Sequence, residues 1–275
     1  MEAAVNGTTL YYERDGKTGN PVCFVLHGGL GLDHHLYRST LGPLTKQFDV
    51  VFLDFRSNGR SGRPPLESLT MEQLADDVNE LANQLGIDRY YVLGHSYGGF
   101  VAQELAIQHP GQVLGLILVG TSPGQVADTE PSTEYAVYPR PEELLAIWRD
   151  AAEDDDETSE ARWRAALPYF TNEDMVPLLS KEFDETIFSA AALQRSDEMY
   201  STWSSTKRLA NVSVPALLIV GTKDIIHPIG QTRRIERALP NTMAIVIEGA
   251  NHFPWLDKPD EFFTAISKWL SDISE

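Results

Sequence analysis

The sequence has little of what disulfide-stapled, secreted and membrane proteins require. It contains a single cysteine, so no disulfide can form within the chain. Cys23 lies inside an apolar run, and we expect it to be a core residue. The first residues lack the basic stretch and apolar core of a signal peptide, and no segment reaches the roughly 18 apolar residues of a membrane span. These absences favour a cytoplasmic protein with no membrane partner.

Positive charge is also in short supply. The chain has 22 Lys and Arg against 40 Asp and Glu, a formal net charge of −18. Because phosphate binding needs clustered cations, we expect no nucleic-acid partner. The acidic run at residues 153–157 lacks the glycine-punctuated spacing of a calcium loop, so we interpret it as a solvated loop and expect no metal. The sequence gives no indication of the oligomeric state.

What the chain does contain is a repeated alternation of strand-like and helix-like segments. Apolar strand patterns alternate with helical ones, of which the clearest is residues 70–85, with a capping box at Thr70 and Gln73 and a C-terminal Gly86. This alternation predicts an α/β fold with a doubly wound, mostly parallel sheet. An antiparallel pair around residues 9–16 is expected to open it. The strand patterns are residues 22–26, 49–54, 90–93, 113–119, 216–222 and 244–250.

The alternation stops between residues 122 and 214. We interpret this region as a helical cap inserted after the sixth strand, with residues 1–121 and 215–275 forming the core domain. One helix-like stretch covers residues 141–149. The region is rich in aromatic side chains, most of which we expect in the cap's own core and a few in an apolar pocket. They include Tyr135, Tyr138, Trp148, Trp163, Tyr169, Phe170, Phe183, Phe188, Tyr200 and Trp203.

The most informative motif surrounds Ser96. It reads Gly-His-Ser-Tyr-Gly-Gly over residues 94–99, directly after a strand pattern and directly before a helix pattern at residues 100–108. A sharp strand-to-helix turn of this kind holds a serine in a strained conformation and exposes its hydroxyl. A Cβ at position 94 or 98 would clash in so tight a turn. The motif therefore predicts that Ser96 is a nucleophile.

A glycine-rich turn supplies a candidate oxyanion hole. His-Gly-Gly-Leu-Gly follows the strand pattern at residues 22–26, and a turn without side chains lets a backbone N–H face a reacting oxygen. We expect the two donors to be the N–H groups of Gly29 and of Tyr97, the residue after the nucleophile.

An acid and a base follow in the order serine, acid, histidine. Asp224 and His252 each come just after a buried strand pattern, so both should lie at the carboxyl edge of the sheet with Ser96. An aspartate holds the imidazole in the required tautomer, and the histidine then takes the serine proton. Asp54 and Asp257 are the competing acids. Asp224 is preferred because it alone follows the strand that succeeds the cap.

At this point the chain resembles the α/β-hydrolase superfamily, and the resemblance covers nearly its whole length. It is closest to proline iminopeptidase-like and esterase- or lactonase-like members, which share an HGG-x-G turn, a segment similar to residues 54–62 and an ending similar to residues 249–253. Two positions depart from the iminopeptidase pattern. Leu30 stands where its turn carries proline, and His95 is more typical of general esterase-like members.

The expected reaction is serine-dependent hydrolysis of a small carboxylic ester or lactone through an acyl-enzyme, with no cofactor. A proline iminopeptidase-like aminopeptidase is the first alternative. It should place a cap carboxylate near the serine, and the available side chains are Glu142, Glu143, Glu182 and Glu185. A non-catalytic ligand sensor on the same fold is the second alternative. Its usual sign is a missing triad residue, whereas all three residues are present here.

Overall fold

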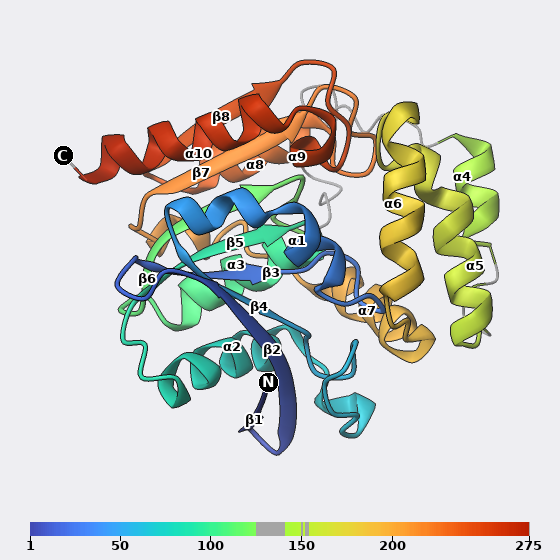
Figure 1. Ribbon diagram of the computed structural model, residues 1–275, viewed down its shortest axis with the longest axis horizontal. Helices are drawn as coiled ribbons and strands as arrows, with labels where there is room; N and C mark the ends of the chain where they lie inside the picture. The colour runs from blue at the N-terminus through green and yellow to red at the C-terminus, as the bar shows by residue number, and fades with distance from the viewer. Residues whose placement is uncertain (125–140, 150, 152–153, 275) are drawn as a thin grey trace.

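The protein is built on one eight-stranded sheet, seen at the centre of Figure 1. The computed structural model describes residues 1–124, 141–149, 151 and 154–274. The strand order is β1-β2-β4-β3-β5-β6-β7-β8, and all neighbouring pairs from β4 to β8 are parallel. The strands are β1 (Glu2–Val5), β2 (Thr8–Gly16), β3 (Val22–Leu26), β4 (Asp49–Leu53), β5 (Tyr90–His95), β6 (Val113–Val119), β7 (Ala216–Gly221) and β8 (Thr242–Ile247). The predicted mostly parallel α/β sheet is confirmed.

Helices cover both faces of the sheet. One apolar cluster joins the sheet to α2 (Met71–Gln84), α3 (Tyr97–Gln108) and α8 (Ile229–Ala238). A second cluster joins the opposite face to α1 (His35–Thr40), α9 (Pro254–Asp257) and α10 (Pro259–Ser274). Cys23 is fully buried in this second cluster, as expected, and burial raises the pKa of its thiol to about 12. The described residues contain no helix long and apolar enough to cross a membrane.

Helix α2 begins and ends at the predicted signals. Thr70 accepts a hydrogen bond from the Gln73 N–H, which satisfies one of the free donors at the helix start. The side chain of Gln73 does not complete the capping box, because it donates to Asp77 instead. At the other end Gly86 adopts φ +68, and the Ile87 N–H returns to the Ala82 carbonyl.

The antiparallel pair at the amino end differs from its expected position. Strands β1 and β2 pair through a tight turn at Asn6 and Gly7, both with positive φ. Asp15 and Gly16, within the range expected to hold the pair, lie at the end of β2, where they pair with β4. The antiparallel opening is therefore confirmed, but its turn comes earlier in the chain.

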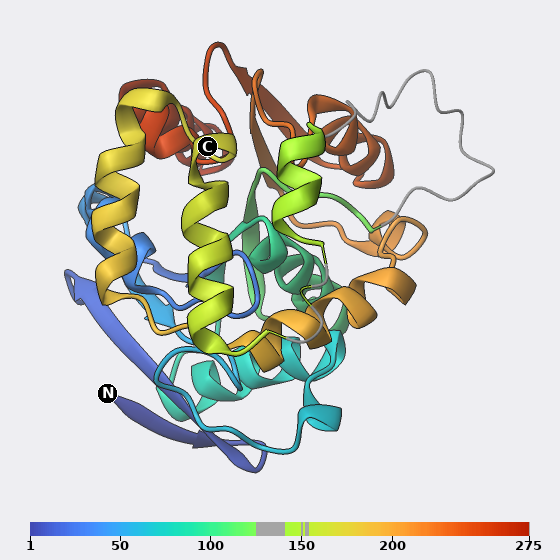
Figure 2. The same ribbon diagram turned by 90° about the vertical axis from the view of Figure 1, so that its right-hand side faces the viewer.

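The described residues between β6 and β7 include four α-helices. They are α4 (Glu142–Ile147), α5 (Asp156–Ala166), α6 (Val176–Glu182) and α7 (Ala190–Thr202). In Figure 1, α4, α5 and α6 stand beside one another at one end of the sheet, and Figure 2 turns this end towards the viewer. The division of the chain into a core and a cap domain stays a prediction.

The acidic run does not form the solvated loop that we expected. In its described part, Asp155 caps α5 by accepting from the Thr158 N–H, and Asp156 accepts from the Ala190 N–H at the start of α7. Carboxylates are favoured at a helix start, because the free N–H groups and the helix dipole attract negative charge there. The run therefore opens a helix.

Candidate active site

Ser96 occupies a strained turn between β5 and α3. Its φ of 51° and ψ of −116° are unusual for a residue with a side chain. The Ser96 N–H donates to the Val119 carbonyl at 2.9 Å, and the Thr121 hydroxyl donates to the Ser96 carbonyl at 2.8 Å. The N–H and the carbonyl of Ser96 are thus fixed by the last residue of β6 and by the loop that follows it, so the turn cannot relax without breaking these bonds.

The two glycines of the motif are required by space, as predicted. A Cβ on Gly94 would lie 2.4 Å from the Gly98 carbonyl oxygen, and a Cβ on Gly98 would lie 2.1 Å from the Leu26 carbonyl oxygen. Neither distance is compatible with a side chain, and both obstacles are backbone atoms that cannot swing away. Strand β3, which ends in the oxyanion turn, therefore packs so closely on the Ser96 turn that only glycine fits at position 98.

Asp224 and His252 are in direct contact. The Asp224 Oδ2 lies 2.8 Å from the His252 Nδ1, and both side chains are buried. The other oxygen, Oδ1, accepts from the N–H groups of Ile226 and His227 at 2.8 Å each. Burial alone would raise the pKa of Asp224, but the His252 ring and these donors outweigh burial and lower it. An ionised Asp224 is therefore available to hold the imidazole.

The two competing aspartates are engaged elsewhere. Asp54 lies 2.5 Å from the His34 Nδ1 and accepts from the Arg60 N–H. Asp257 accepts from the N–H groups of Asn172 and Asn251. Of the three candidates, Asp224 is the one hydrogen-bonded to His252, which supports the preference drawn from the sequence.

The expected oxyanion donors are free to bind a ligand. Gly29 has φ +51, and the N–H of neither Gly29 nor Tyr97 has an acceptor among the described residues. The neighbouring Gly28 N–H, in contrast, donates to the Tyr37 hydroxyl at 2.6 Å. Trp163 covers this turn, because a Cβ on Gly29 would lie 3.0 Å from its ring.

The Ser96 turn lies next to His252, but the Ser96 hydroxyl makes no hydrogen bond to the His252 ring. This hydroxyl has no partner among the described residues. The ring of the preceding residue, His95, lies 4.5 Å from the His252 ring, and the His95 Nε2 lies 2.9 Å from the His252 carbonyl oxygen. Catalytic hydrogen bonds are often long in a ligand-free enzyme and tighten when substrate binds. The structure thus brings acid and base into contact and places the serine turn against the base.

The surroundings of His252 are aromatic. Its ring lies 5.5 Å from Phe170, which comes from the inserted region, and 5.8 Å from His227. His227 in turn meets the edge of Phe100 on α3. The described aromatics of the insertion do not gather in one core of their own, because Tyr200 and Trp203 pack on Phe100 of α3. Phe170 and Trp163 reach the site. Tyr135 and Tyr138 lie outside the described residues.

The four glutamates weighed for an aminopeptidase have different surroundings. Glu142 pairs with Arg149 at the surface, and Glu143 and Glu185 are exposed. Glu182 lies 3.3 Å from the His35 Nε2. Two of these carboxylates therefore already have a partner. No group of three or more His, Cys, Asp and Glu side chains in the described residues forms a candidate metal site.

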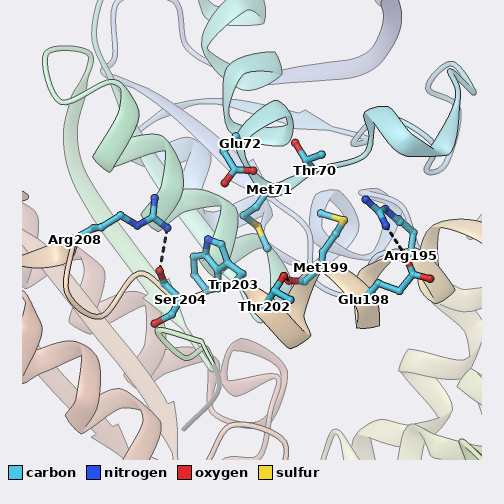
Figure 3. Close-up of a pocket in the computed structure, with 10 residues that line it drawn as sticks. All are labelled: Thr70, Met71, Glu72, Arg195, Glu198, Met199, Thr202, Trp203, Ser204 and Arg208. Atoms are coloured by element: carbon cyan, nitrogen blue, oxygen red, sulfur yellow. Dashed lines mark hydrogen bonds and ion pairs between the residues drawn. The ribbon is translucent and has the colours of Figure 1, made fainter. Parts of the chain in front are cut away.

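A separate pocket of about 490 Å³ lies between α2 and α7 (Figure 3). Met71, Met199 and Trp203 are among its lining residues, and Arg195 and Arg208 lie on opposite sides of it. Each arginine already pairs with a carboxylate, Arg195 with Glu198 and Arg208 with buried Glu104. Ser96, Asp224 and His252 do not line this pocket, so it is distinct from the candidate site.

The sequence argument missed three residues that shape the site. His95 entered it only as a departure from a family pattern, and Tyr37 and His227 did not enter it. His95 carries a usable signal, since it immediately precedes the nucleophile. Tyr37 carries none, because it lies in α1 and meets His95 only through the fold.

The comparisons with known proteins agree with this geometry. The model of the alpha/beta hydrolase fold family matches residues 21–259, and the chain belongs to that family. It is 27% identical to the proline iminopeptidase PfmaB of Pestalotiopsis fici, over 93% of this chain and 94% of that one. It is 26% identical to a pimeloyl-[acyl-carrier protein] methyl ester esterase of Vibrio atlanticus, over 92% and 95% of the two chains.

Solved structures give the same picture. The enol-lactonase of Burkholderia xenovorans LB400 superposes with a TM-score of 0.81 at 26% identity, covering 98% of this chain and all of that one. A thermophilic esterase of Thermogutta terrifontis superposes with a TM-score of 0.78 at 25% identity, over 99% and 97% of the two chains. The chain is thus a member of a hydrolase family whose relatives include esterases, a lactonase and an iminopeptidase.

Proposed function

We propose that this protein is a serine hydrolase that cleaves a small carboxylic ester or lactone through an acyl-enzyme. Ser96 is the nucleophile, His252 the general base and acid, and Asp224 the residue that orients His252. The observation that carries this proposal is the 2.8 Å contact between the Asp224 carboxylate and the His252 Nδ1, beside a serine held at φ 51°.

The chemistry follows from these positions. The Asp224 carboxylate accepts a hydrogen bond from the Nδ1–H of His252, which leaves Nε2 free to take the Ser96 proton as Oγ attacks the carbonyl carbon. The N–H groups of Gly29 and Tyr97 stabilise the negative charge that develops on the carbonyl oxygen. His252 then gives the proton to the leaving oxygen as the bond between carbon and that oxygen breaks. Water, activated by the same imidazole, releases the acid and restores Ser96.

An ester or lactone is favoured over a peptide for two reasons. Two of the four glutamates weighed for an aminopeptidase already have partners, Glu142 with Arg149 and Glu182 beside His35, and the other two are exposed. Trp163 packs its ring on the Gly29 turn and Phe170 lies 5.5 Å from the His252 ring, so apolar surface borders the expected oxyanion donor and the base. The esterase and enol-lactonase among the similar proteins point the same way.

A substrate panel tests this proposal. It contains p-nitrophenyl esters of varied chain length, an acyl homoserine lactone and a proline aminoacyl amide. We expect kcat/KM for the best ester or lactone to exceed that for the amide at least about tenfold, or about 1.4 kcal/mol of transition-state binding. A kcat/KM that is higher for the amide establishes the aminopeptidase instead. The 27% identity to a proline iminopeptidase is the observation that favours this alternative.

A non-catalytic sensor is the remaining alternative. It predicts that the panel is not hydrolysed and that Ser96 does not react with an active-site phosphonate. The cytoplasmic location and the two-domain division inferred from the sequence are part of the same proposal.

A further inference from the structure

A buried histidine next to the nucleophile has no role in the mechanism above. His95 ends β5 directly before Ser96, and its side chain is 1% exposed. Its ring is enclosed by other rings, with centroids 4.5 Å away at His252, 4.9 Å at Phe253 and 4.8 Å at Trp255. A polar side chain so deeply buried needs hydrogen-bond partners, and the partners of the His95 ring indicate what it holds in place.

Both ring nitrogens of His95 are hydrogen-bonded, and they point to different parts of the site. Nε2 lies 2.9 Å from the backbone carbonyl oxygen of His252. Nδ1 lies 2.8 Å from the Tyr37 hydroxyl, which itself accepts from the Gly28 N–H at 2.6 Å. His95 and Tyr37 thus connect the oxyanion turn to the backbone of the catalytic base.

The donor and the acceptor in each of these hydrogen bonds follow from the groups at the two ends of the chain of bonds, the Gly28 N–H and the His252 carbonyl. The His252 carbonyl can only accept, so the proton of His95 is on Nε2. Burial, reinforced by the nearby His252 ring, holds the pKa of His95 well below its usual value, so the ring is neutral and Nδ1 is an acceptor. The Tyr37 hydroxyl therefore donates to Nδ1 and accepts from Gly28. All three bonds run in one direction, from the Gly28 N–H to the His252 carbonyl.

We propose that Tyr37 and His95 form a positioning relay that sets the distance between the oxyanion turn and the catalytic base, because together they hydrogen-bond Gly28 and His252 on either side of Ser96. This inference rests on the proposed function. Neither residue touches the reacting atoms. Both act through the groups that they hold.

Space around the relay supports this role. A Cβ on Gly28 would lie 2.8 Å from the His95 Nδ1, 2.8 Å from the Tyr37 hydroxyl and 3.0 Å from the Ser96 Cβ. The turn is therefore packed directly on the relay and on the nucleophile. Because the turn follows β3, the nucleophile follows β5 and the base follows β8, no local contact along the chain fixes their spacing. A shift of about 1 Å in such a site costs on the order of 10²-fold in rate.

Three variants separate the two halves of the relay. Tyr37→Phe removes the hydroxyl that links Gly28 to Nδ1. His95→Gln keeps an amide donor near the Nε2 position but removes the acceptor, whereas His95→Asn keeps an acceptor near the Nδ1 position but removes the donor. Tyr90→Phe is the matched control, because it removes a fully buried tyrosine hydroxyl that donates to Asn79 at 3.0 Å, away from the site.

We expect Tyr37→Phe and His95→Gln each to lower kcat roughly 10- to 100-fold with KM within about twofold, measured on the best ester of the panel. Tyr90→Phe should lose a similar amount of thermal stability and keep its kcat. The double variant Tyr37→Phe with His95→Gln should lose no more than the worse single variant, because both interrupt the same bond. His95→Asn should retain the Tyr37 link and break the bond to the His252 carbonyl, and its loss should not add to that of Tyr37→Phe, because either change interrupts the same relay.

Two results overturn the relay. One is a kcat for Tyr37→Phe and His95→Gln within twofold of the parent, or losses that multiply in the double variant. The other is a side-chain ¹⁵N NMR spectrum in which the His95 proton is on Nδ1 at neutral pH. A parent protein whose Ser96 does not react with a fluorophosphonate contradicts the proposed function instead, and the NMR tautomer still decides whether the hydrogen-bonded chain exists.

Discussion

Two serines among the described residues have a left-handed backbone, and their surroundings differ. Ser96 has φ 51° after β5, and Ser57 has φ 64° after β4. Such a conformation costs on the order of 1–2 kcal/mol for a residue with a side chain. Strain of the same kind is therefore present after two strands of one sheet, which β3 separates.

The surroundings of the two residues separate them. Ser96 lies beside two N–H groups that have no acceptor among the described residues, and next to a base that is held by a carboxylate. Ser57 is 1% exposed, and its buried hydroxyl has no hydrogen-bond partner in the part of the chain that the structure describes. Its backbone N–H donates to the Gly62 carbonyl, and the adjacent Arg56 forms a buried ion pair with Asp77. Strain thus shows where the fold holds a residue firmly, and the neighbouring groups decide whether that residue can react.

The largest expected difference between the two serines is in catalysis. Ser96→Ala should leave a folded protein whose kcat is lower by roughly 10³- to 10⁶-fold, because triad members act as a unit. Ser57→Ala should keep kcat within about twofold. Steady-state hydrolysis of the best ester by both purified variants gives the comparison. Near-parental activity in Ser96→Ala would mean that the proposed mechanism is wrong.

The next effect sharpens the contrast through two acids, Asp224, which holds the base beside Ser96, and Asp54, which follows β4 near Ser57. Asp224→Asn should lower kcat about 10⁴-fold, because an amide leaves His252 in the wrong tautomer. Asp54→Asn, in the loop that leads to Ser57, should lower stability but keep kcat, since Asp54 bonds His34 and the Arg60 N–H. Full activity in Asp224→Asn, together with a loss in Asp54→Asn or Asp257→Asn, would move the assignment to another acid.

A smaller effect concerns the pH dependence of folding near Ser57. His27 donates from Nδ1 to the Gly28 carbonyl and accepts at Nε2 from the Phe55 N–H, so it must be neutral. Burial lowers its pKa to about 4. Below about pH 6.5, His27 binds a proton in the unfolded chain but stays neutral in the folded protein. Stability should therefore fall as the pH drops from about 6.5 to 4, by up to roughly 3 kcal/mol.

Denaturant unfolding of the parent and of His27→Gln across this range measures the effect. The variant should be less stable at pH 7 but should lose less stability on acidification, because carboxylates contribute equally to both proteins. Parallel curves for the two proteins would show that His27 does not titrate in this way.

The smallest effect tests the strain at Ser57 itself. Ser57→Gly removes the positive-φ cost and the unpartnered hydroxyl, against a glycine entropy cost of about 0.5–1 kcal/mol. We expect a net gain of about 1 kcal/mol in the free energy of unfolding, with kcat unchanged. A loss of stability on this substitution would show that the Ser57 side chain contributes packing that outweighs its strain.

Much of this fold could be predicted because its signals are local. Strand ends coincide with the apolar runs, so Ser96, Asp224 and His252 could be assigned to one edge of the sheet from the sequence. The structure places the Asp224 Oδ2 2.8 Å from the His252 Nδ1. The turn at Asn6 and Gly7 also had a local signal, since Asn-Gly is typical of tight hairpins, and it was overlooked.

The remaining features depend on contacts across the fold. Tyr37 and His95 are 58 positions apart and meet only because α1 packs against the end of β5. Composition alone does not reveal that Asp155 and Asp156 satisfy N–H groups at helix starts, because an acidic run looks the same in a loop. Side-chain partners at long sequence separation are thus the part that required the structure.

Mapping the site of a fluorophosphonate adduct tests the central claim most directly. The parent and the Ser57→Ala variant are treated with the reagent, digested and analysed by mass spectrometry. The account predicts one adduct, on the peptide that contains Ser96, in both proteins, and none in Ser96→Ala. An adduct on another residue with Ser96 unmodified, or ester hydrolysis that persists after Ser96 is fully modified, would contradict it.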